Sequence, residues 1–206
     1  MSQLATDPVP TGNTYDKYNT TNPVAKRLQA GFERTLDELF DRAGPDSILD
    51  IGCGEGVLTY QWAEKLGDKR VVGLDLPDEK LQAEWETRRR PNLEYVTMPA
   101  ENLPFEADEF DCASAVEVLE HVPEPDHTLA EMARVAKRHL LVSVPREPMW
   151  RGLNMARGAY LRDWGNTPGH LNHWSKSGFV SFLGTVGEPV AVRSPFPWTM
   201  VLVRLP

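Results

Sequence analysis

The chain has 206 residues, of which 41% are hydrophobic and 25% charged, with a formal net charge of −8. This composition is ordinary for a soluble globular protein, and the length favours a single domain covering residues 1–206. The acidic balance argues against non-specific nucleic-acid binding, which needs a basic surface. No signal peptide is visible and no apolar run reaches the roughly 18 residues that span a bilayer, so we expect a cytoplasmic protein without a membrane partner.

The N-terminal segment, residues 1–45, is expected to form a helical lid. Asn22 is a favourable N-cap and Pro23 a favourable first helical residue, and apolar side chains then recur at helical spacing. Ahead of a ligand-binding domain, such a segment can fold over the ligand. Tyr15 and Tyr18 would then contact cofactor or substrate; the alternative is that they pack the helix against the core.

A buried strand, Ile48–Ile51, is predicted to run into a glycine-rich turn and then a helix. The turn has glycine at alternate positions, namely Gly52, Gly54 and Gly56. Because glycine lacks Cβ, the backbone can turn sharply there and approach a ligand closely, and the following helix start points unpaired N–H groups at it. The third glycine comes one place too early for the dinucleotide pattern G-x-G-x-x-G.

Two acids indicate which ligand would suit this turn. Asp50 stands two residues before the first glycine, where a carboxylate would repel a pyrophosphate but suit an ammonium or sulfonium group. A second strand at residues 70–76 carries Asp75 near its end, where an acid can accept hydrogen bonds from both ribose hydroxyls. Together they favour a positively charged adenosine ligand without phosphates, and S-adenosylmethionine fits.

Strands and helices alternate through the rest of this region. Helices are expected at 57–66, 78–89 and 125–137, and strands at 93–97, 110–116 and 139–144. This alternation predicts a parallel sheet with helices on both faces, whose ligands lie beyond the carboxyl ends of the strands.

The segment Ile48 to Gly56, together with Asp75, resembles motif I and the second-strand acid of class I S-adenosylmethionine-dependent methyltransferases. The resemblance implies an α/β fold: a Rossmann-like three-layer α/β/α sandwich around a mostly parallel seven-stranded sheet with an antiparallel last strand. It also implies S-adenosylmethionine as cofactor and S-adenosylhomocysteine as product. The expected cofactor-binding residues are Asp50, Gly52, Cys53, Gly54, Asp75, Leu76, Ala100, Glu101, Asn102 and Glu117. In the adenine loop, Pro99 stands where the family often has an acid, so Glu101, Asn102 or a backbone carbonyl would have to replace it.

Residues 146–174 break the alternation and mix aromatic with hydrogen-bonding side chains. We expect a substrate-covering insert with a short amphipathic helix at 149–161; a dimer interface or a packing insert is the alternative. The expected acceptor-binding residues there are Trp150, Arg151, Asn154 and Tyr160. A helix at 175–186, ended by Gly187, and strands at 190–193 and 199–205 complete the chain.

A hydroxyl acceptor would need a base to take its proton, and histidine titrates near neutrality. The candidate catalytic residues are His170, His173 and His121, of which His121 is often a structural or gating residue in the resembled family. Glu120 could orient a histidine or be solvated. His127 and His139 look structural.

The expected function is methyl transfer to a hydroxyl of a small molecule, such as a sugar. Carbon or nitrogen methylation, and a non-catalytic protein that binds the cofactor, remain alternatives, as does a nucleotide-linked oxidoreductase. A metal site from Glu117, Glu120, His121 and His173 is conceivable, but Mg²⁺ prefers carboxylates and no compact Asp/Asn cluster is visible, so none is predicted. The protein would be a monomer or homodimer.

Overall fold

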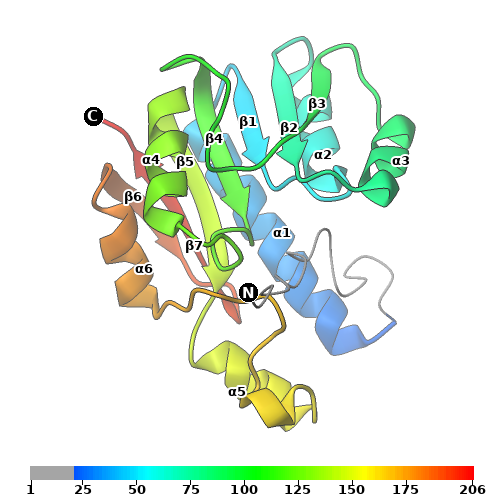
Figure 1. The fold of residues 1–206 in the computed structure, drawn as a ribbon, viewed down its shortest axis with the longest axis vertical. Helices are drawn as coiled ribbons and strands as arrows, with labels where there is room; N and C mark the ends of the chain where they lie inside the picture. The colour runs from blue at the N-terminus through cyan, green and yellow to red at the C-terminus, as the bar shows by residue number, and fades with distance from the viewer. Residues whose placement is uncertain (1–20) are drawn as a thin grey trace, which may run out of the picture.

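The computed structural model describes residues 21–206, so the expected contacts of Tyr15 and Tyr18 lie outside the described residues. The helices are α1 (Pro23–Ala43), α2 (Val57–Leu66), α3 (Glu79–Thr87), α4 (Pro125–Val135), α5 (Met149–Ala156), the 3₁₀ turn η1 (Leu161–Asp163) and α6 (Lys176–Leu183). The strands are β1 (Ile48–Ile51), β2 (Val71–Asp75), β3 (Leu93–Thr97), β4 (Phe110–Val116), β5 (Ala136–Pro145), β6 (Glu188–Arg193) and β7 (Trp198–Arg204). Figure 1 shows their arrangement.

One seven-stranded sheet has the order β3-β2-β1-β4-β5-β7-β6. Strands β1 to β5 pair in parallel, whereas β7 pairs antiparallel with both β5 and β6. The register sets Asp50 between Gly73 of β2 and Ser114 of β4. The order changes direction between β1 and β4, which is the place where open α/β sheets bind ligands. The expected mostly parallel sheet with an antiparallel last strand is confirmed.

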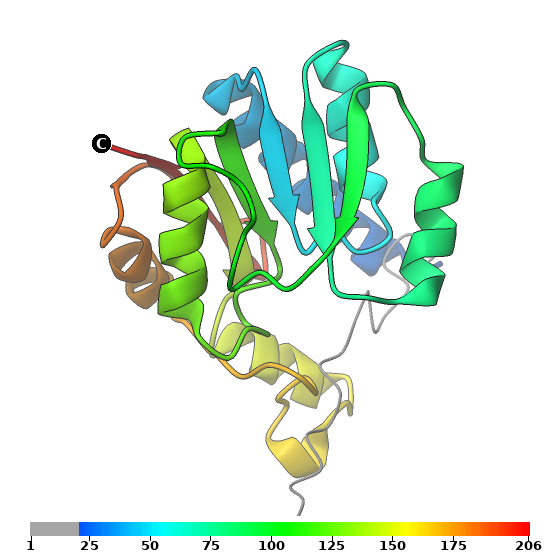
Figure 2. The ribbon, with the colours of Figure 1, turned by 45° about the horizontal axis from the view of Figure 1, so that its top comes forward.

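Apolar side chains pack on both faces of the sheet and form a three-layer structure (Figure 2). One core joins the sheet to α4 and α6 and includes Leu129, Met132, Phe179 and Leu183. The other joins it to α1 and α2 and includes Leu36, Phe40 and Trp62. Because parallel strands are covered on both faces, β1 is buried along its whole length.

The insert lies beyond the carboxyl ends of the parallel strands, with α5 below the arrowheads of β4 and β5 in Figure 1. Its helix is shorter than expected and ends at Ala156 instead of residue 161. Gly158 has φ of 73° and Tyr160 has φ of 53°, and such left-handed residues end a helix before the turn η1.

Other boundary errors lie at helix ends and in the last two strands, where β6 begins two residues and β7 one residue earlier than expected. Helix α4 ends at Val135 and passes directly into β5, three residues earlier than the strand start that we expected. Helix α6 ends at Leu183, because Gly184, not Gly187, is its C-cap. Within residues 21–206, no helix combines the length and apolar character needed to cross a bilayer.

Candidate active site

The glycine turn after β1 is fixed to β2 by its own backbone. The N–H groups of Gly52 and Cys53 donate to the carbonyl of Leu74 at 2.8 and 2.9 Å. Gly52 has φ of 70°, and a Cβ there would lie 2.4 Å from Cγ2 of Val118. Gly52 is therefore required by close contact with the loop after β4.

Gly54 is different, because a Cβ added there would meet no described atom within 4 Å. Its φ of 54° is nevertheless left-handed. The backbone at this position is thus open toward the edge of the sheet where a ligand would approach, which fits the close contact expected for a nucleoside cofactor.

Asp75 at the end of β2 contacts the same turn. Its Oδ2 accepts a hydrogen bond from the N–H of Gly54 at 2.7 Å, and its Oδ1 accepts one from Leu76 at 2.7 Å. Desolvation raises the pKa of Asp75 above its usual value despite these two donors. A carboxylate has about four lone-pair sites, so both oxygens keep acceptor capacity for ribose hydroxyls.

Two aromatic residues that sequence reasoning missed support the turn from below. Trp85 of α3 donates its indole N–H to the carbonyl of Gly54 at 2.8 Å, and its ring stacks on Tyr95 of β3 at 5.0 Å. The Tyr95 hydroxyl donates to the carbonyl of Gly56 at 3.3 Å. The sequence indicates this role only by an aromatic residue, Trp85, two positions before the end of α3.

Asp50 lies beneath the turn and is 2% exposed. Its two oxygens accept hydrogen bonds from Thr59 (2.6 Å) and Ser114 (2.9 Å). Burial nevertheless raises the pKa of Asp50 to about 6, since neutral hydroxyls compensate only part of the lost hydration. Desolvation, with the nearby acids, also raises the pKa of the Cys53 thiol, so this cysteine is not a nucleophile at neutral pH.

The adenine-loop candidates lie beside Asp75, because the N–H of Met98 donates to the Asp75 carbonyl at 2.9 Å. Ala100 and Glu101 are half-buried and Asn102 is exposed. Their contacts with adenine stay a prediction.

Glu117 directly follows β4 and has a left-handed φ of 62°, which is rare for a residue with a side chain. Its N–H donates to the carbonyl of Ser143 at 3.1 Å, and its Oε1 accepts from the Ser143 hydroxyl at 2.9 Å. Strand β5 therefore holds Glu117 at the carboxyl edge of the sheet. Such strain is found most often at functional sites.

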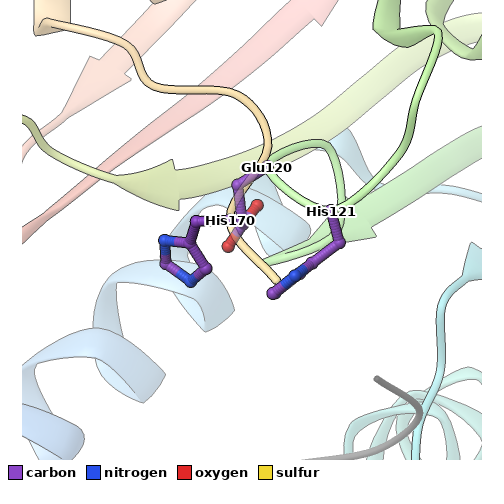
Figure 3. Close-up of side chains that lie close together, drawn as sticks. All are labelled: Glu120, His121 and His170. Atoms are coloured by element: carbon purple, nitrogen blue, oxygen red, sulfur yellow. The ribbon is translucent and has the colours of Figure 1, made fainter. Parts of the chain in front are cut away.

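Three of the side chains beyond β4 and in the insert form a cluster. Glu120, His121 and His170 each place one nitrogen or oxygen atom within 4.8 Å of those of the others. Figure 3 shows the Glu120 carboxylate between the two rings. The two imidazoles are 4.8 Å apart, edge to face, and Glu120 is 2% exposed. The alternative that Glu120 is solvated is therefore wrong.

The third candidate, His173, points instead to the insert. Its Nε2 lies 2.9 Å from the Arg151 guanidinium and 2.7 Å from Oδ1 of Asn166. Desolvation and the Arg151 charge lower the pKa of His173. Its ring is 6.4 Å from His170, so it is a neighbour of the cluster but does not belong to it.

The expected acceptor-binding residues have different environments. Asn154 is 2% exposed and donates to Gly165 and Thr167, so it holds the insert together and we no longer assign it to the acceptor. Trp150 also donates to Thr167, and its ring lies nearly parallel to His170 at 6.3 Å. Tyr160 is 36% exposed.

A seven-stranded sheet of this order, with a glycine turn after β1 and an acid at the end of β2, defines the class I S-adenosylmethionine-dependent methyltransferase fold. A family profile described as "Methyltransferase domain" matches residues 49–141, from β1 into β5. Residues 49–141, which carry the glycine turn, Asp50 and Asp75, are thus similar to a methyltransferase domain.

The relatives are named for two different reactions, methylation of oxygen and methylation of carbon. The ubiquinone biosynthesis O-methyltransferase of Pseudoalteromonas translucida (strain TAC 125) is 36% identical over 102 residues, 48% of this chain and 41% of that protein. The ubiquinone/menaquinone biosynthesis C-methyltransferase UbiE of Cronobacter sakazakii (strain ATCC BAA-894) is 35% identical over 155 residues, 70% of this chain and 61% of that protein. The chain spans only about one third to three fifths of the length of the curated relatives it matches.

Solved structures agree on the fold. Magnesium protoporphyrin IX methyltransferase (ChlM) from Synechocystis PCC 6803, with bound S-adenosylhomocysteine, aligns with a TM-score of 0.66 and 19% identity. The alignment covers 91% of this chain and 89% of that one.

Proposed function

We propose that this protein transfers the methyl group of S-adenosylmethionine to a hydroxyl oxygen of a small molecule. One observation carries the proposal: the loop that bears Glu120 and His121 packs through Val118 against Gly52 of the glycine turn. The cluster of a carboxylate and two imidazoles therefore lies next to the cofactor-binding edge of the sheet.

The reaction is an in-line displacement. The acceptor oxygen attacks the methyl carbon, the bond from that carbon to sulfur breaks, and the electron pair stays on sulfur to give S-adenosylhomocysteine. Holding the reacting atoms about 3–3.5 Å apart supplies much of the acceleration. The hydroxyl must lose its proton, and a positioned base contributes about 10²–10⁴-fold.

The geometry favours His121 and His170 over His173 as that base. A carbonyl oxygen only accepts, so Nδ1 of His121, 2.9 Å from the Gly169 carbonyl, carries a proton and donates it. The other nitrogen of a neutral His121 then keeps its lone pair. Nε2 of His173 instead lies 2.9 Å from the Arg151 guanidinium and 2.7 Å from Oδ1 of Asn166, so two side chains of the insert already contact the nitrogen that a base would use.

The acceptor that we favour carries its hydroxyl on a ring, either a sugar or a phenol. The Trp150 ring next to His170 offers a flat face to stack such a ring, and Arg151 and Tyr160 offer polar groups. The similarity to ubiquinone biosynthesis O-methyltransferases supports a hydroxyl acceptor.

Methylation of a ring carbon is the second candidate, because the C-methyltransferase UbiE matches more of this chain than the O-methyltransferases do. The ring carbon would attack the methyl carbon, sulfur would keep the electron pair, and the ring would then lose the proton of the methylated carbon. The two candidates give different products from one acceptor, which nuclear magnetic resonance of the product distinguishes.

The test is methyl transfer from tritiated S-adenosylmethionine to glycosides, catechols and hydroquinones. His170→Ala should lower kcat about 10²–10⁴-fold with S-adenosylhomocysteine affinity retained. His173→Ala should have a much smaller effect, and His127→Ala, an exposed histidine of α4, should have none. Cofactor binding without any labelled product would instead identify a non-catalytic binding protein, and calorimetry that detects NAD but not S-adenosylhomocysteine would overturn the proposal.

A further inference from the structure

We propose that Glu120, His121 and His170 bind one divalent transition-metal cation. Two imidazoles and one carboxylate are a ligand set that first-row metals accept readily, with positions left open for other ligands. The set differs from the one that the sequence made conceivable, because the fold brings His170 and not His173 to Glu120 and His121.

The distances suit a small cation. The three ligand atoms lie within 4.8 Å of one another (Figure 3). Ligands about 2.0–2.2 Å from a tetrahedral metal are roughly 3.4 Å apart. Binding therefore needs the three ligand atoms to move somewhat closer together.

The hydrogen bond of His121 prepares it as a ligand. Histidines that bind metals usually donate their other ring N–H to a carbonyl or carboxylate, which fixes both the tautomer and the ring orientation. Nδ1 of His121 donates in this way to the carbonyl of Gly169 at 2.9 Å. Nε2 is therefore the nitrogen of this ring that would coordinate the cation.

The two segments that supply the ligands are fixed to each other. The carbonyl of Glu120 accepts hydrogen bonds from the N–H groups of Leu171 (2.7 Å) and Asn172 (3.0 Å). The side-chain amide of Asn172 donates to the carbonyls of Leu119 (3.0 Å) and Val122 (2.7 Å). These bonds hold His170 beside Glu120 across 50 residues of sequence, so the ligands are arranged before a cation binds.

Charge and burial favour a cation at this place. Glu120 is 2% exposed and His170 is 9% exposed. A carboxylate oxygen and two imidazole nitrogens that are held together away from water are groups that a cation can coordinate. Imidazole nitrogen suits Zn²⁺, Co²⁺ or Fe²⁺, whereas Mg²⁺ prefers oxygen ligands and its own water.

The use of the cation rests on the proposed function, although its binding does not. Three protein ligands leave room for the acceptor oxygen. The cation would lower the pKa of the bound hydroxyl, and the proton would leave to water. The oxygen would then attack the methyl group. With the cation bound, His121 and His170 would act as its ligands and would not take the hydroxyl proton themselves.

The test uses untagged full-length protein, stripped with EDTA and titrated with Co²⁺, followed by visible absorption and calorimetry. We expect one equivalent to bind. Glu120→Gln and His170→Ala should each weaken Co²⁺ binding at least 10-fold, His127→Ala should leave it unchanged, and millimolar Mg²⁺ should not displace Co²⁺. Calorimetry with S-adenosylhomocysteine on each variant checks that the fold is retained.

Three results would overturn the inference. They are no stoichiometric Co²⁺ binding by the wild type, wild-type affinity in both Glu120→Gln and His170→Ala, and displacement by Mg²⁺ at similar concentration. A protein that binds Co²⁺ through these residues but methylates nothing would support the metal site and refute the proposed function. A protein that methylates an acceptor without binding Co²⁺ would support the proposed function and refute the metal site.

Discussion

Oδ2 of Asp75 lies 2.7 Å from the backbone nitrogen of Gly54 and accepts its hydrogen bond. The acid at the end of β2 and the glycine turn after β1 are therefore one structural unit. The same bond points the carboxylate along the carboxyl edge of the sheet, where a ribose would lie next to both elements.

Because Asp75 and the glycine turn form one unit, we expect Asp75→Asn to weaken cofactor binding. The amide replaces one acceptor oxygen with a donor, so it loses the bond from Gly54 or from Leu76, and one oxygen can no longer accept from a ribose hydroxyl. Hydrogen bonds to charged groups contribute about 1.5–3 kcal/mol, and the affinity for S-adenosylhomocysteine should fall about 10- to 100-fold in calorimetry.

Asp78→Asn is the matched control for this change. It removes the same charge three residues further on, and asparagine replaces aspartate well as the N-cap of α3. Equal loss of affinity in both variants would mean that charge, and not hydrogen bonding, explains the effect.

Gly52 and Gly54 should respond differently to alanine. Each substitution places a side chain at positive φ, at a cost of about 1–2 kcal/mol. Gly52→Ala also overlaps Val118 and should lose a further 1–3 kcal/mol of stability, approximately. Gly54→Ala should lose cofactor affinity with little additional loss of stability.

Chemical denaturation and calorimetry measure the two effects separately. Adding Val118→Ala to Gly52→Ala should recover part of the lost stability, because it removes the clashing methyl groups. No recovery would show that the strain at Gly52 has another source.

Asp50 should make the protein less stable as pH rises from about 4 to 6. Its pKa is 3.8 in the unfolded chain and about 6 when folded, so the folded state binds the extra proton in this range. Stability falls with pH wherever the folded state binds more protons, here by about 2–3 kcal/mol in total.

Unfolding free energies of wild type and Asp50→Asn between pH 4 and 7 check this prediction. The unfolding free energy of the variant should fall less steeply with pH than that of the wild type. Part of the fall should remain, because the pKa of Asp75 is also raised. Parallel curves would contradict the raised pKa of Asp50.

Asn172→Ala should release the insert from the loop after β4. It leaves the carbonyls of Leu119 and Val122 without their side-chain donor, which costs about 1–3 kcal/mol for each group that water does not reach. Hydrogen exchange should increase at residues 119–122 and 169–172. Asn166→Ala, in the same insert, should leave residues 119–122 protected.

Local patterns were sufficient to predict most of the framework. The ranges of α2, β3 and β4 were predicted to the residue, because their apolar periodicity ends at clear turn residues. Helix α5 was predicted too long, since left-handed residues such as Tyr160 do not differ in sequence from helical ones. The passage from α4 into β5 was missed because no glycine or proline separates them.

The site was predictable only in part, because local sequence patterns record only local structure. Asp50, the glycines and Asp75 are spaced along one strand–turn–helix–strand unit, so the sequence alone determined the methyltransferase fold and the cofactor that it suits. The pairing of His170 with Glu120 and His121, the exclusion of His173 and the support from Trp85 were decided only by tertiary structure. They depend on contacts between segments 30 to 50 residues apart, and no local periodicity records which of several similar side chains the folded chain brings together.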